Sequence, residues 1–323
     1  MSDNHMRAAQ LRAPGTVAMV RAKRPSPGAG EVLIRVEGCG VCASNLLPWQ
    51  GSEWIDYPLP PGALGHEAWG VVETVGADVT DLMRGDRVAA LSAASYAEYD
   101  VAPADACVRL PPELDGRPFP GEAIACAFNI FRRSLIEPGQ TVAIIGIGFL
   151  GAILTRLASR AGARVIAISR RATSLDLAEH FGAANQIPMD HHQTIIEQVY
   201  ALTDGRGCDC VIEAVGKQWP LDLAGELVRE GGRLVIAGYH QDGPRQVNMQ
   251  MWNWKGIDIV SAHERDPAVQ RRGLKEAVTA VAAGWLDPTP LYSGGFPIER
   301  LGEALDATAD KPAGFVKVWV TFA

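Results

Sequence analysis

The spacing of apolar residues changes once along the chain, near residue 120. Before that point, short apolar runs are separated by Gly and Pro, which is typical of short strands joined by tight turns. After it, up to about residue 266, apolar runs alternate with amphipathic stretches of helical period. Strands that alternate with helices predict a parallel sheet covered by helices on both faces. We therefore expect an α/β protein, with an irregular β-rich region followed by a doubly wound parallel sheet.

This pattern divides the chain into three segments. Residues 1–121 are expected to form a β-rich catalytic domain, and residues 122–266 the doubly wound domain. Residues 267–323 contain one helical pattern and one apolar strand, too little to bury a core alone. We expect this last segment to return to the first domain.

A glycine-rich turn indicates what the doubly wound domain binds. Gly146, Gly148 and Gly151 follow an apolar strand directly and stand at the start of a helical pattern. In a dinucleotide site the first glycine permits the tight turn, the second lets the backbone approach the pyrophosphate, and the third lets helix and strand pack closely. Phe149 and Leu150 lie where the N–H groups of a helix N-terminus bind phosphate. The motif alone is weak, but its place between strand and helix predicts a Rossmann domain that binds a dinucleotide.

The end of the next predicted strand indicates which dinucleotide binds. A site for NAD usually carries Asp or Glu there, which bonds the ribose hydroxyls. This chain has Ser169, followed by Arg170 and Arg171. Serine removes a carboxylate that would repel a 2′-phosphate, and Arg170 can gain about 1.5–3 kcal/mol from each charged hydrogen bond to that phosphate. The sequence predicts a preference for NADP(H) over NAD(H); the alternative is that both arginines are solvated loop charges.

Composition and charge narrow the class of protein. A formal charge of −7, without a Lys/Arg cluster, argues against binding of nucleic acid or an anionic membrane. The uncharged stretch 138–155 approaches transmembrane length, but its glycines indicate a buried strand running into a helix. The polar N-terminus lacks the apolar core of a signal peptide, and six cysteines are too sparse for a disulfide framework. We expect a soluble cytoplasmic protein.

Several residues of metal-ligand type occur in or beside the first domain. Cys42, His66 and Glu67 lie in two Gly-rich segments, and Glu122 lies where the second domain begins. A thiolate, an imidazole and a carboxylate are ligands of catalytic zinc, which keeps one position open for substrate. Taken singly, each residue also has an ordinary structural explanation, as a buried thiol, a core histidine or a surface carboxylate.

The surroundings of these residues resemble a known family. Residues 65–88, which open with Gly-His-Glu and close with Gly-Asp-Arg-Val, resemble the zinc signature of the medium-chain dehydrogenase/reductase superfamily, in its zinc alcohol and polyol dehydrogenase group. Residues 40–45, 122–133, 230–238 and 296–320 resemble that family's first ligand segment, interdomain helix, fifth sheet strand and C-terminal return. The resemblance covers nearly the whole chain. It implies a Rossmann domain together with a GroES-like catalytic domain.

The resemblance implies a role for each candidate residue. Cys42 and His66 would ligate the catalytic zinc, and Glu67 would be a supporting or alternating ligand. Glu122 matches the glutamate ligand of polyol-type members, with Cys126 one helical turn later as the other candidate. Ser44 matches the hydroxyl that passes the substrate proton onward.

Three departures from the family pattern bear on the chemistry. Asn45 stands where the family usually has an aspartate that supports the metal-binding histidine, and the loss of its charge can alter the acidity of bound water. Leu47 stands where a relay histidine is often found, so protons must leave by another route. Residues 89–96 are too few for the lobe that holds a structural zinc in many relatives, so we expect one Zn²⁺ per chain.

Together these features predict a zinc-dependent oxidoreductase that transfers hydride between NADP(H) and an alcohol, a polyol or a sugar-type substrate, or its carbonyl form. One alternative is a zinc-free NADPH-dependent reductase of quinones or activated alkenes, although such relatives usually lack the Cys and His ligands. The other is a non-catalytic NADPH-binding protein. Trp49, Trp54 and Tyr57 either line the substrate pocket or pack a loop, and His263 could reach the cofactor or a subunit boundary. The expected partners are a small-molecule substrate and further copies of the chain in a dimer or tetramer, because this family tends to pair through sheet edges.

Overall fold

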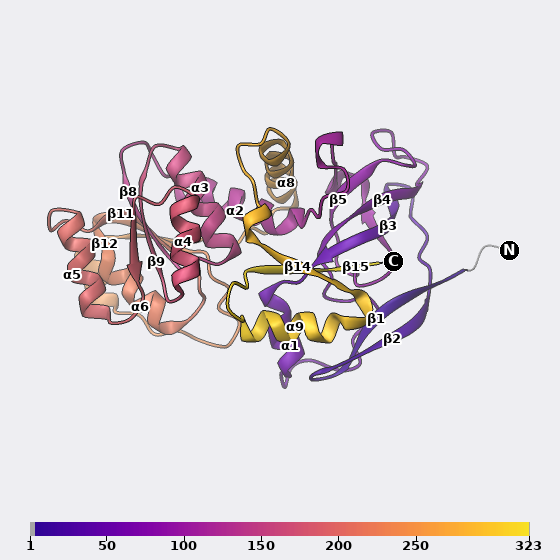
Figure 1. The fold of residues 1–323 in the computed structure, drawn as a ribbon, viewed down its shortest axis with the longest axis horizontal. Coiled ribbons are helices and arrows are strands. Elements are labelled where there is room, and N and C mark those ends of the chain that lie inside the picture. Colours follow the sequence, from indigo (N-terminus) through magenta and orange to yellow (C-terminus); the bar gives the residue numbers. More distant parts are fainter. Residues whose placement is uncertain (1–3, 323) are drawn as a thin grey trace. The chain divides into compact units, whose positions relative to one another are not determined.

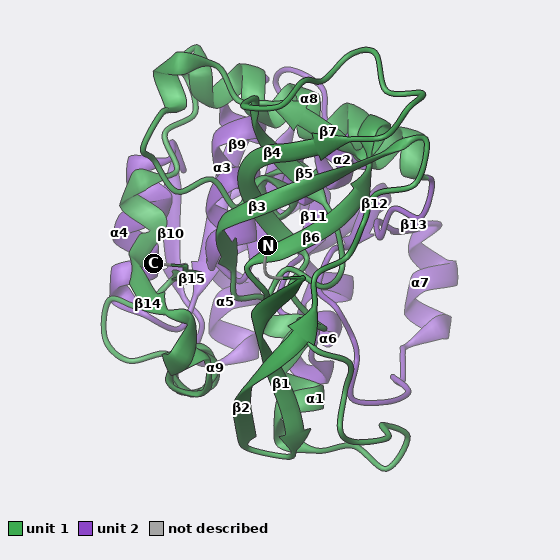
Figure 2. Cartoon of the chain, turned by 90° about the vertical axis from the view of Figure 1, so that its right-hand side faces the viewer, with its two compact units in different colours: residues 1–125, 267–323 green, residues 126–266 purple. Residues whose placement is uncertain are grey.

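The computed structural model describes residues 4–322, which divide into two compact units (Figure 1). Unit 1 comprises residues 1–125 and 267–323, and unit 2 comprises residues 126–266 (Figure 2). The boundary falls within helix α2 (Gly121–Ser134). Unit 1 is therefore discontinuous in sequence, whereas unit 2 is one continuous segment.

Unit 2 is built on a six-stranded sheet in the order β10-β9-β8-β11-β12-β13, and every neighbouring pair of strands is parallel. Helices lie on both sides of this sheet (Figure 1). The strands are β8 (Thr141–Ile145), β9 (Arg164–Ser169), β10 (Asn185–Pro188), β11 (Cys208–Glu213), β12 (Val228–Ile236) and β13 (Asp258–Ser261). The helices are α3 (Phe149–Arg160), α4 (Ala172–His180), α5 (His192–Leu202), α6 (Gln218–Leu227) and α7 (Met249–Lys255). The predicted doubly wound domain is confirmed.

The central strands of this sheet are apolar on both faces because helices cover both faces. Residues 142–145 of β8 and 165–168 of β9 are all buried. The uncharged stretch 138–155 forms β8 and the first turns of α3. No helix within residues 4–322 is long and apolar enough to cross a membrane.

Unit 1 contains a seven-stranded sheet, β14-β15-β3-β4-β5-β7, in which β6 also pairs with β3. Its pairs are antiparallel except for β14 with β15. A separate antiparallel hairpin joins β1 (His5–Ala13) to β2 (Thr16–Lys23). The sheet strands are β3 (Glu31–Gly40), β4 (Glu67–Val75), β5 (Arg87–Leu91), β6 (Tyr99–Pro103), β7 (Cys107–Arg109), β14 (Tyr292–Pro297) and β15 (Lys317–Thr321). The helices are α1 (Leu46–Gln50), α8 (Pro267–Ala282) and α9 (Leu301–Asp310).

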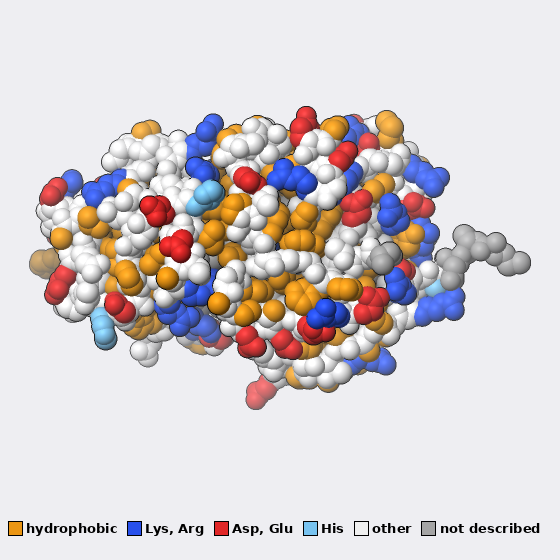
Figure 3. Space-filling model, viewed as in Figure 1, with side chains coloured by type: hydrophobic (Ala, Val, Ile, Leu, Met, Phe, Trp, Pro, Cys, Tyr) orange, Lys and Arg blue, Asp and Glu red, His pale blue; other side chains and the backbone are white. Residues whose placement is uncertain are grey.

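The C-terminal segment completes this sheet. Strand β15 pairs with the end of β3, with Trp319 opposite Gly40 and Val320 opposite Cys39. A strand near the end of the chain therefore lies directly beside the strand that leads to the first candidate ligand. On the face shown in Figure 3, acidic and basic side chains are interspersed rather than gathered by sign.

Candidate functional site

Two paired strands bring three candidate metal ligands together. Cys42 follows the end of β3, whereas His66 and Glu67 stand at the start of β4. Because β3 and β4 are antiparallel neighbours, the end of one lies beside the start of the other. The ligand atoms of the three residues all lie within 4.8 Å of one another.

The His66 ring is oriented by a backbone carbonyl. Its Nδ1 lies 2.8 Å from the Leu64 oxygen, and since a carbonyl only accepts, Nδ1 carries the proton and Nε2 is the atom left for a metal. Burial alone would lower the pKa of His66, but its hydrogen bond to Cys42 and the negative charges of Cys42, Glu122 and Glu67 raise that pKa to about 10. The surroundings of His66 therefore favour a positive charge strongly, which is the electrostatic property that a metal site requires.

Glu67 is completely buried and only half satisfied. Its Oε1 accepts a hydrogen bond from Lys317 Nζ at 2.6 Å, whereas Oε2 meets no hydrogen-bond partner among residues 4–322. A buried carboxylate oxygen without a partner is costly, so Oε2 is available to a further positive group. Gly40 makes room for this oxygen, because a Cβ there would lie 1.8 Å from Oε2.

The donor set fits a catalytic zinc ion. One thiolate sulfur, one imidazole nitrogen and carboxylate oxygens are the combination that zinc takes where it keeps a position open for substrate. The unpartnered oxygen of Glu67 is the independent structural sign that a cation belongs there. Cys42, His66 and Glu67 could therefore hold the metal.

Lys317 is a functional residue that sequence reasoning missed. It lies on β15, is 6% exposed, and donates a second hydrogen bond to the Val41 oxygen at 3.1 Å. Burial would lower the pKa of Lys317, but the charges of Glu67, Cys42 and Glu122 raise it above its ordinary value, so the lysine stays charged. The available signal was a single charged residue inside an otherwise apolar last strand.

Asn45 supports the histidine through the same carbonyl. Its Nδ2 donates to the Leu64 oxygen at 3.2 Å and to the Tyr96 hydroxyl at 2.7 Å. The Leu64 oxygen thus accepts hydrogen bonds from both His66 Nδ1 and Asn45 Nδ2. Ser44 completes the group, because its hydroxyl donates to Asn45 Oδ1 at 3.3 Å. An amide can therefore orient the histidine here, although it lacks the charge of the family's usual aspartate.

Glu122 is the further candidate ligand. It lies in the first turn of α2, and its charge raises the pKa of both His66 and Lys317. Within residues 4–322 it is not one of the ligands whose atoms lie within 4.8 Å of one another. Cys126, the other candidate, lies one turn further along α2, in unit 2. Glu122 is thus placed to act on the site through its charge.

The glycine-rich turn has the geometry of a dinucleotide site. Gly146 directly follows β8 and has φ +97°, a region that favours glycine. A Cβ on Gly151 would lie 2.0 Å from the Gly146 oxygen, so only glycine lets α3 pack this closely on the turn. A Cβ on Gly148 would meet no described atom within 4 Å, which leaves open space before the N-terminus of α3. The turn therefore fits a pyrophosphate.

The end of β9 places two cations next to each other. Ser169 is buried at the last position of the strand, Arg170 is exposed, and Arg171 is half-buried before the start of α4. Burial and the charge of Arg170 lower the pKa of Arg171. An anion bound beside the two arginines would relieve their repulsion. This arrangement can accept a 2′-phosphate.

Two of the three aromatic residues after the first ligand pack a core. Trp49 is buried and its Nε1 donates to Asp306 at 2.8 Å, and the Tyr57 hydroxyl donates to the Pro48 oxygen. Both rings belong to the hydrophobic cluster that also contains residues of α9. Trp54, by contrast, is 72% exposed. The packing interpretation therefore holds for Trp49 and Tyr57.

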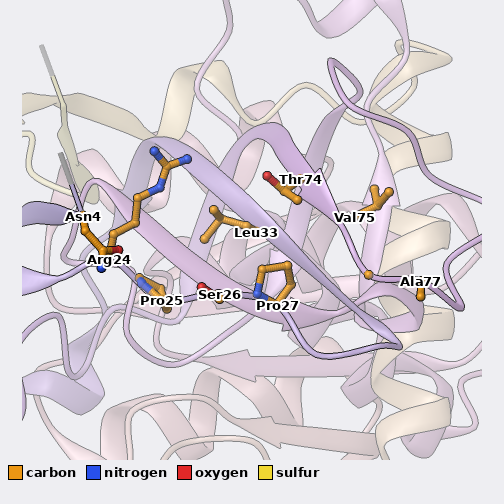
Figure 4. A pocket seen from close by; sticks show the side chains of 10 residues that line it. Asn4, Arg24, Pro25, Ser26, Pro27, Leu33, Thr74, Val75 and Ala77 are labelled. Carbon is orange, nitrogen blue, oxygen red and sulfur yellow. The ribbon is translucent and has the colours of Figure 1, made fainter. Parts of the chain in front are cut away.

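A surface cavity of about 480 Å³ lies elsewhere in unit 1 (Figure 4). Arg24 in its lining stacks over the Tyr99 ring at 3.7 Å and pairs with Glu73 at 3.4 Å, so its charge is already engaged. The candidate metal ligands do not line this cavity. It is separate from the chemistry of the metal site.

Comparison with known proteins gives two domain matches and many relatives. Residues 28–112 match the alcohol dehydrogenase GroES-like domain, and residues 150–281 match the zinc-binding dehydrogenase family. An alcohol dehydrogenase of Geobacillus stearothermophilus is 30% identical over 322 residues, covering 88% of this chain and 90% of its own. A sorbitol dehydrogenase of Gallus gallus is 29% identical over 328 residues, covering 88% of each. A zinc-binding dehydrogenase structure from Sinorhizobium meliloti, bound to NADP, is 27% identical with a TM-score of 0.84, covering 98% of this chain and 99% of its own.

The chain therefore belongs to the zinc-dependent medium-chain dehydrogenase/reductase superfamily. The predicted resemblance and the pairing of a GroES-like with a Rossmann domain are confirmed. Membership makes the protein an oxidoreductase.

Proposed function

We propose that this protein is a zinc-dependent dehydrogenase that transfers hydride between NADP(H) and an alcohol, a polyol or a sugar-type substrate, or its carbonyl form. One observation carries the proposal: the half-satisfied, buried Glu67 beside Cys42 and His66. The alcohol and sorbitol dehydrogenases among the relatives support the substrate class.

In this proposal Cys42, His66 and Glu67, with Glu122 as the further candidate, hold one zinc ion per chain. Bound there, zinc polarises the substrate oxygen as a Lewis acid, and the nicotinamide cofactor supplies or accepts the hydride. The Leu64 oxygen keeps the His66 proton on Nδ1 and so keeps Nε2 directed into the site.

Ser44 holds the proton of the substrate hydroxyl. Its bond to Asn45 Oδ1 is long, at 3.3 Å, so the hydroxyl can turn toward another acceptor. Because Leu47 has no titratable group, the proton leaves Ser44 by a route that does not use position 47. Lys317 donates a hydrogen bond to Glu67 Oε1 and so supplies the charged partner of this buried side chain.

The cofactor assignment rests on unit 2. Ser169, Arg170 and Arg171 are proposed to receive the 2′-phosphate of NADP(H), and the NADP bound by the Sinorhizobium meliloti relative supports that choice. Replacing Arg170 with Ala should lower the affinity for NADPH about tenfold to a hundredfold while leaving that for NADH nearly unchanged. If the variant lost the same affinity for NADPH and NADH, the proposed preference for NADP(H) would be contradicted. The pyrophosphate is assigned to Gly146, Gly148, Phe149, Leu150 and Gly151.

We propose that residues 1–121 with 267–323 form the catalytic part and that residues 122–266 form the cofactor-binding part.

We also propose that the protein is a homo-oligomer, either a dimer or a tetramer. Strand β13 is the outer strand of its sheet, and Ile259 on it is 42% exposed. Trp254 on the neighbouring helix α7 is 86% exposed. Such an apolar edge suits pairing with a second copy. Light scattering on Ile259→Lys should then report a smaller assembly than the wild type.

Metal analysis tests the whole proposal. The purified protein should contain one zinc ion per chain, and Cys42→Ser should lose both this zinc and the turnover of alcohols with NADP. The matched control is Cys107→Ser, which removes another thiol of unit 1 outside the candidate site. Protein without stoichiometric zinc, whose turnover survives chelation, would instead favour the zinc-free reductase.

A further inference from the structure

Two aromatic rings are stacked at the carboxyl edge of the parallel sheet in unit 2. Tyr239 follows the end of β12, and His263 follows the end of β13. Their ring centroids lie 5.2 Å apart and their planes differ by 16°. Tyr239 is 50% exposed, so His263 covers only part of its ring.

The residues before and after Tyr239 are both held by one buried residue, Glu213. Glu213, at the end of β11, is fully buried. Its backbone oxygen accepts the N–H groups of Ala237 and Gly238, each at 2.8 Å. Its Oε2 lies 3.0 Å from Nε2 of His240, the residue after Tyr239. A ring presented by so constrained a backbone loses little entropy when a ligand binds.

The same glutamate fixes the adjacent turn. Glu213 Oε1 accepts the N–H groups of Val215 and Gly216 at 2.7 and 2.8 Å. Arg245 Nε donates to His240 Nδ1 at 2.9 Å, so the histidine proton lies on Nε2 and points at Glu213. Hydrogen bonds thereby join the loops after β11 and β12.

His263 is held in place as a neutral ring. Its backbone oxygen accepts a hydrogen bond from Arg133 Nη1 at 3.1 Å. Burial and the charge of Arg265 lower the pKa of His263. A neutral imidazole supports the tyrosine without adding a positive charge that would repel an oxidised nicotinamide ring.

The topology of the sheet shows which half of a dinucleotide meets this pair. A doubly wound sheet has two mononucleotide-binding halves on either side of the point where the strand order reverses. The turn at Gly146 and the arginine at Arg170 follow β8 and β9, so the adenosine half belongs there. The half made by β11, β12 and β13 is left for the nicotinamide mononucleotide. Tyr239 and His263 stand at the ends of two of these three strands.

We propose that Tyr239, backed by His263, is a stacking platform for the nicotinamide half of the cofactor. The platform fixes the plane of the ring and contributes affinity, while the hydride chemistry remains with the cofactor. This inference rests on the proposed function, because it requires that the protein binds a nicotinamide dinucleotide.

Binding measurements on three variants test the platform. NADPH is titrated by fluorescence, and 2′,5′-ADP, which lacks the nicotinamide half, is titrated by calorimetry. Tyr239→Ala should weaken NADPH about tenfold, the size of one good stacking contact, and leave 2′,5′-ADP within about twofold. Tyr239→Phe keeps the ring and should bind both like the wild type. His180→Ala removes an exposed aromatic ring at the end of α4, elsewhere in unit 2, and should change neither affinity.

The outcomes separate this inference from the proposed function. If the wild type binds neither NADPH nor NADH, the proposed function is wrong and the platform with it. If the wild type binds NADPH but Tyr239→Ala binds it equally well, only the platform is wrong. Equal losses of NADPH and 2′,5′-ADP would also overturn the platform, because a general disturbance of unit 2 would then explain the result.

Discussion

Each unit contains a fully buried glutamate, and the two are satisfied in different ways. Glu213 in unit 2 uses both carboxylate oxygens, which accept two backbone N–H groups and pair with His240. Glu67 in unit 1 pairs with Lys317 through one oxygen and leaves the other without a partner among the described residues. The first carboxylate organises loops, whereas the second remains able to bind another cation. The two carboxylates are equally buried, so burial alone does not separate them; the oxygen of Glu67 without a partner does.

The largest effect should follow removal of the positive charge of Lys317, the partner of Glu67. Lys317→Met leaves Glu67 buried without its charged partner, so the zinc-free protein should lose about 3–5 kcal/mol in free energy of unfolding. Lys317→Arg keeps the charge and should lose less. Urea unfolding of chelator-treated protein measures both variants. Adding Glu67→Gln to Lys317→Met should recover part of the loss, and a double variant no more stable than Lys317→Met would contradict this explanation.

Both carboxylate oxygens of Glu213 have partners, so the free energy of unfolding should be less sensitive to loss of its charge. Glu213→Gln keeps one acceptor oxygen for the backbone N–H groups but turns an amide donor toward His240. We expect a loss of about 1–3 kcal/mol in free energy of unfolding, measured by the same urea titration. Glu230→Gln, an exposed residue of the same type, should stay within about 0.5 kcal/mol of the wild type. A Glu213→Gln loss as small as that of Glu230→Gln would mean that the hydrogen bonds of Glu213 contribute nothing.

A smaller effect should come from the residue that shares the carbonyl with His66. Asn45→Leu removes the hydrogen bond to the Leu64 oxygen, so the ring is held less firmly and zinc affinity should fall about tenfold. Competition with a fluorescent chelator measures this affinity. Ser44→Ala is the control. It removes the hydrogen bond to Asn45 Oδ1 and leaves the bond from Asn45 Nδ2 to Leu64, so it should retain the wild-type zinc affinity. Unchanged affinity in Asn45→Leu would show that the Leu64 carbonyl orients His66 unaided.

The smallest effect concerns the carboxylate of Asp209, which lies on β11 with Glu213 but is partly exposed. Burial would raise the pKa of Asp209, yet hydrogen bonds from Arg229 and the Thr141 N–H lower it below its ordinary 3.8. Its contribution is therefore present above pH 3.8 and is lost as the pH falls through the lower, folded-state value. Asp209→Asn should cost about 1 kcal/mol at pH 7, with the difference from wild type vanishing in acid. Urea unfolding across pH measures this, and a difference that persists in acid would contradict an ionic origin.

The geometry of the glycine-rich turn could be predicted because all its parts are contiguous in the sequence. The strands predicted on either side of this turn are β8 and β9, and Gly146 and Gly151 between them lie in contacts too close for a Cβ. Local sequence determines this kind of site, since one strand, one turn and one helix build it.

The candidate metal site is different because its residues meet only through sheet pairing. The resemblance to a family pointed to Cys42 and His66, but no pattern along the chain showed that β15 would pair with β3 and bring Lys317 to Glu67. Glu213 was missed for the same reason. Its partners lie in loops whose approach depends on the assembled sheet, so a lone glutamate in an apolar strand carried no visible role.

Glu67 and Lys317 are 250 positions apart in the sequence, which also affects how the protein is synthesised. The ribosome releases the thiol, the imidazole and the carboxylate early, and the lysine that balances them late. Unit 2 is continuous, so it can fold on the nascent chain while unit 1 still lacks strand β15. Until that strand is made, Glu67 lacks the charged partner with which it is buried in the folded protein. Completion of unit 1 is thus postponed until after translation of unit 2.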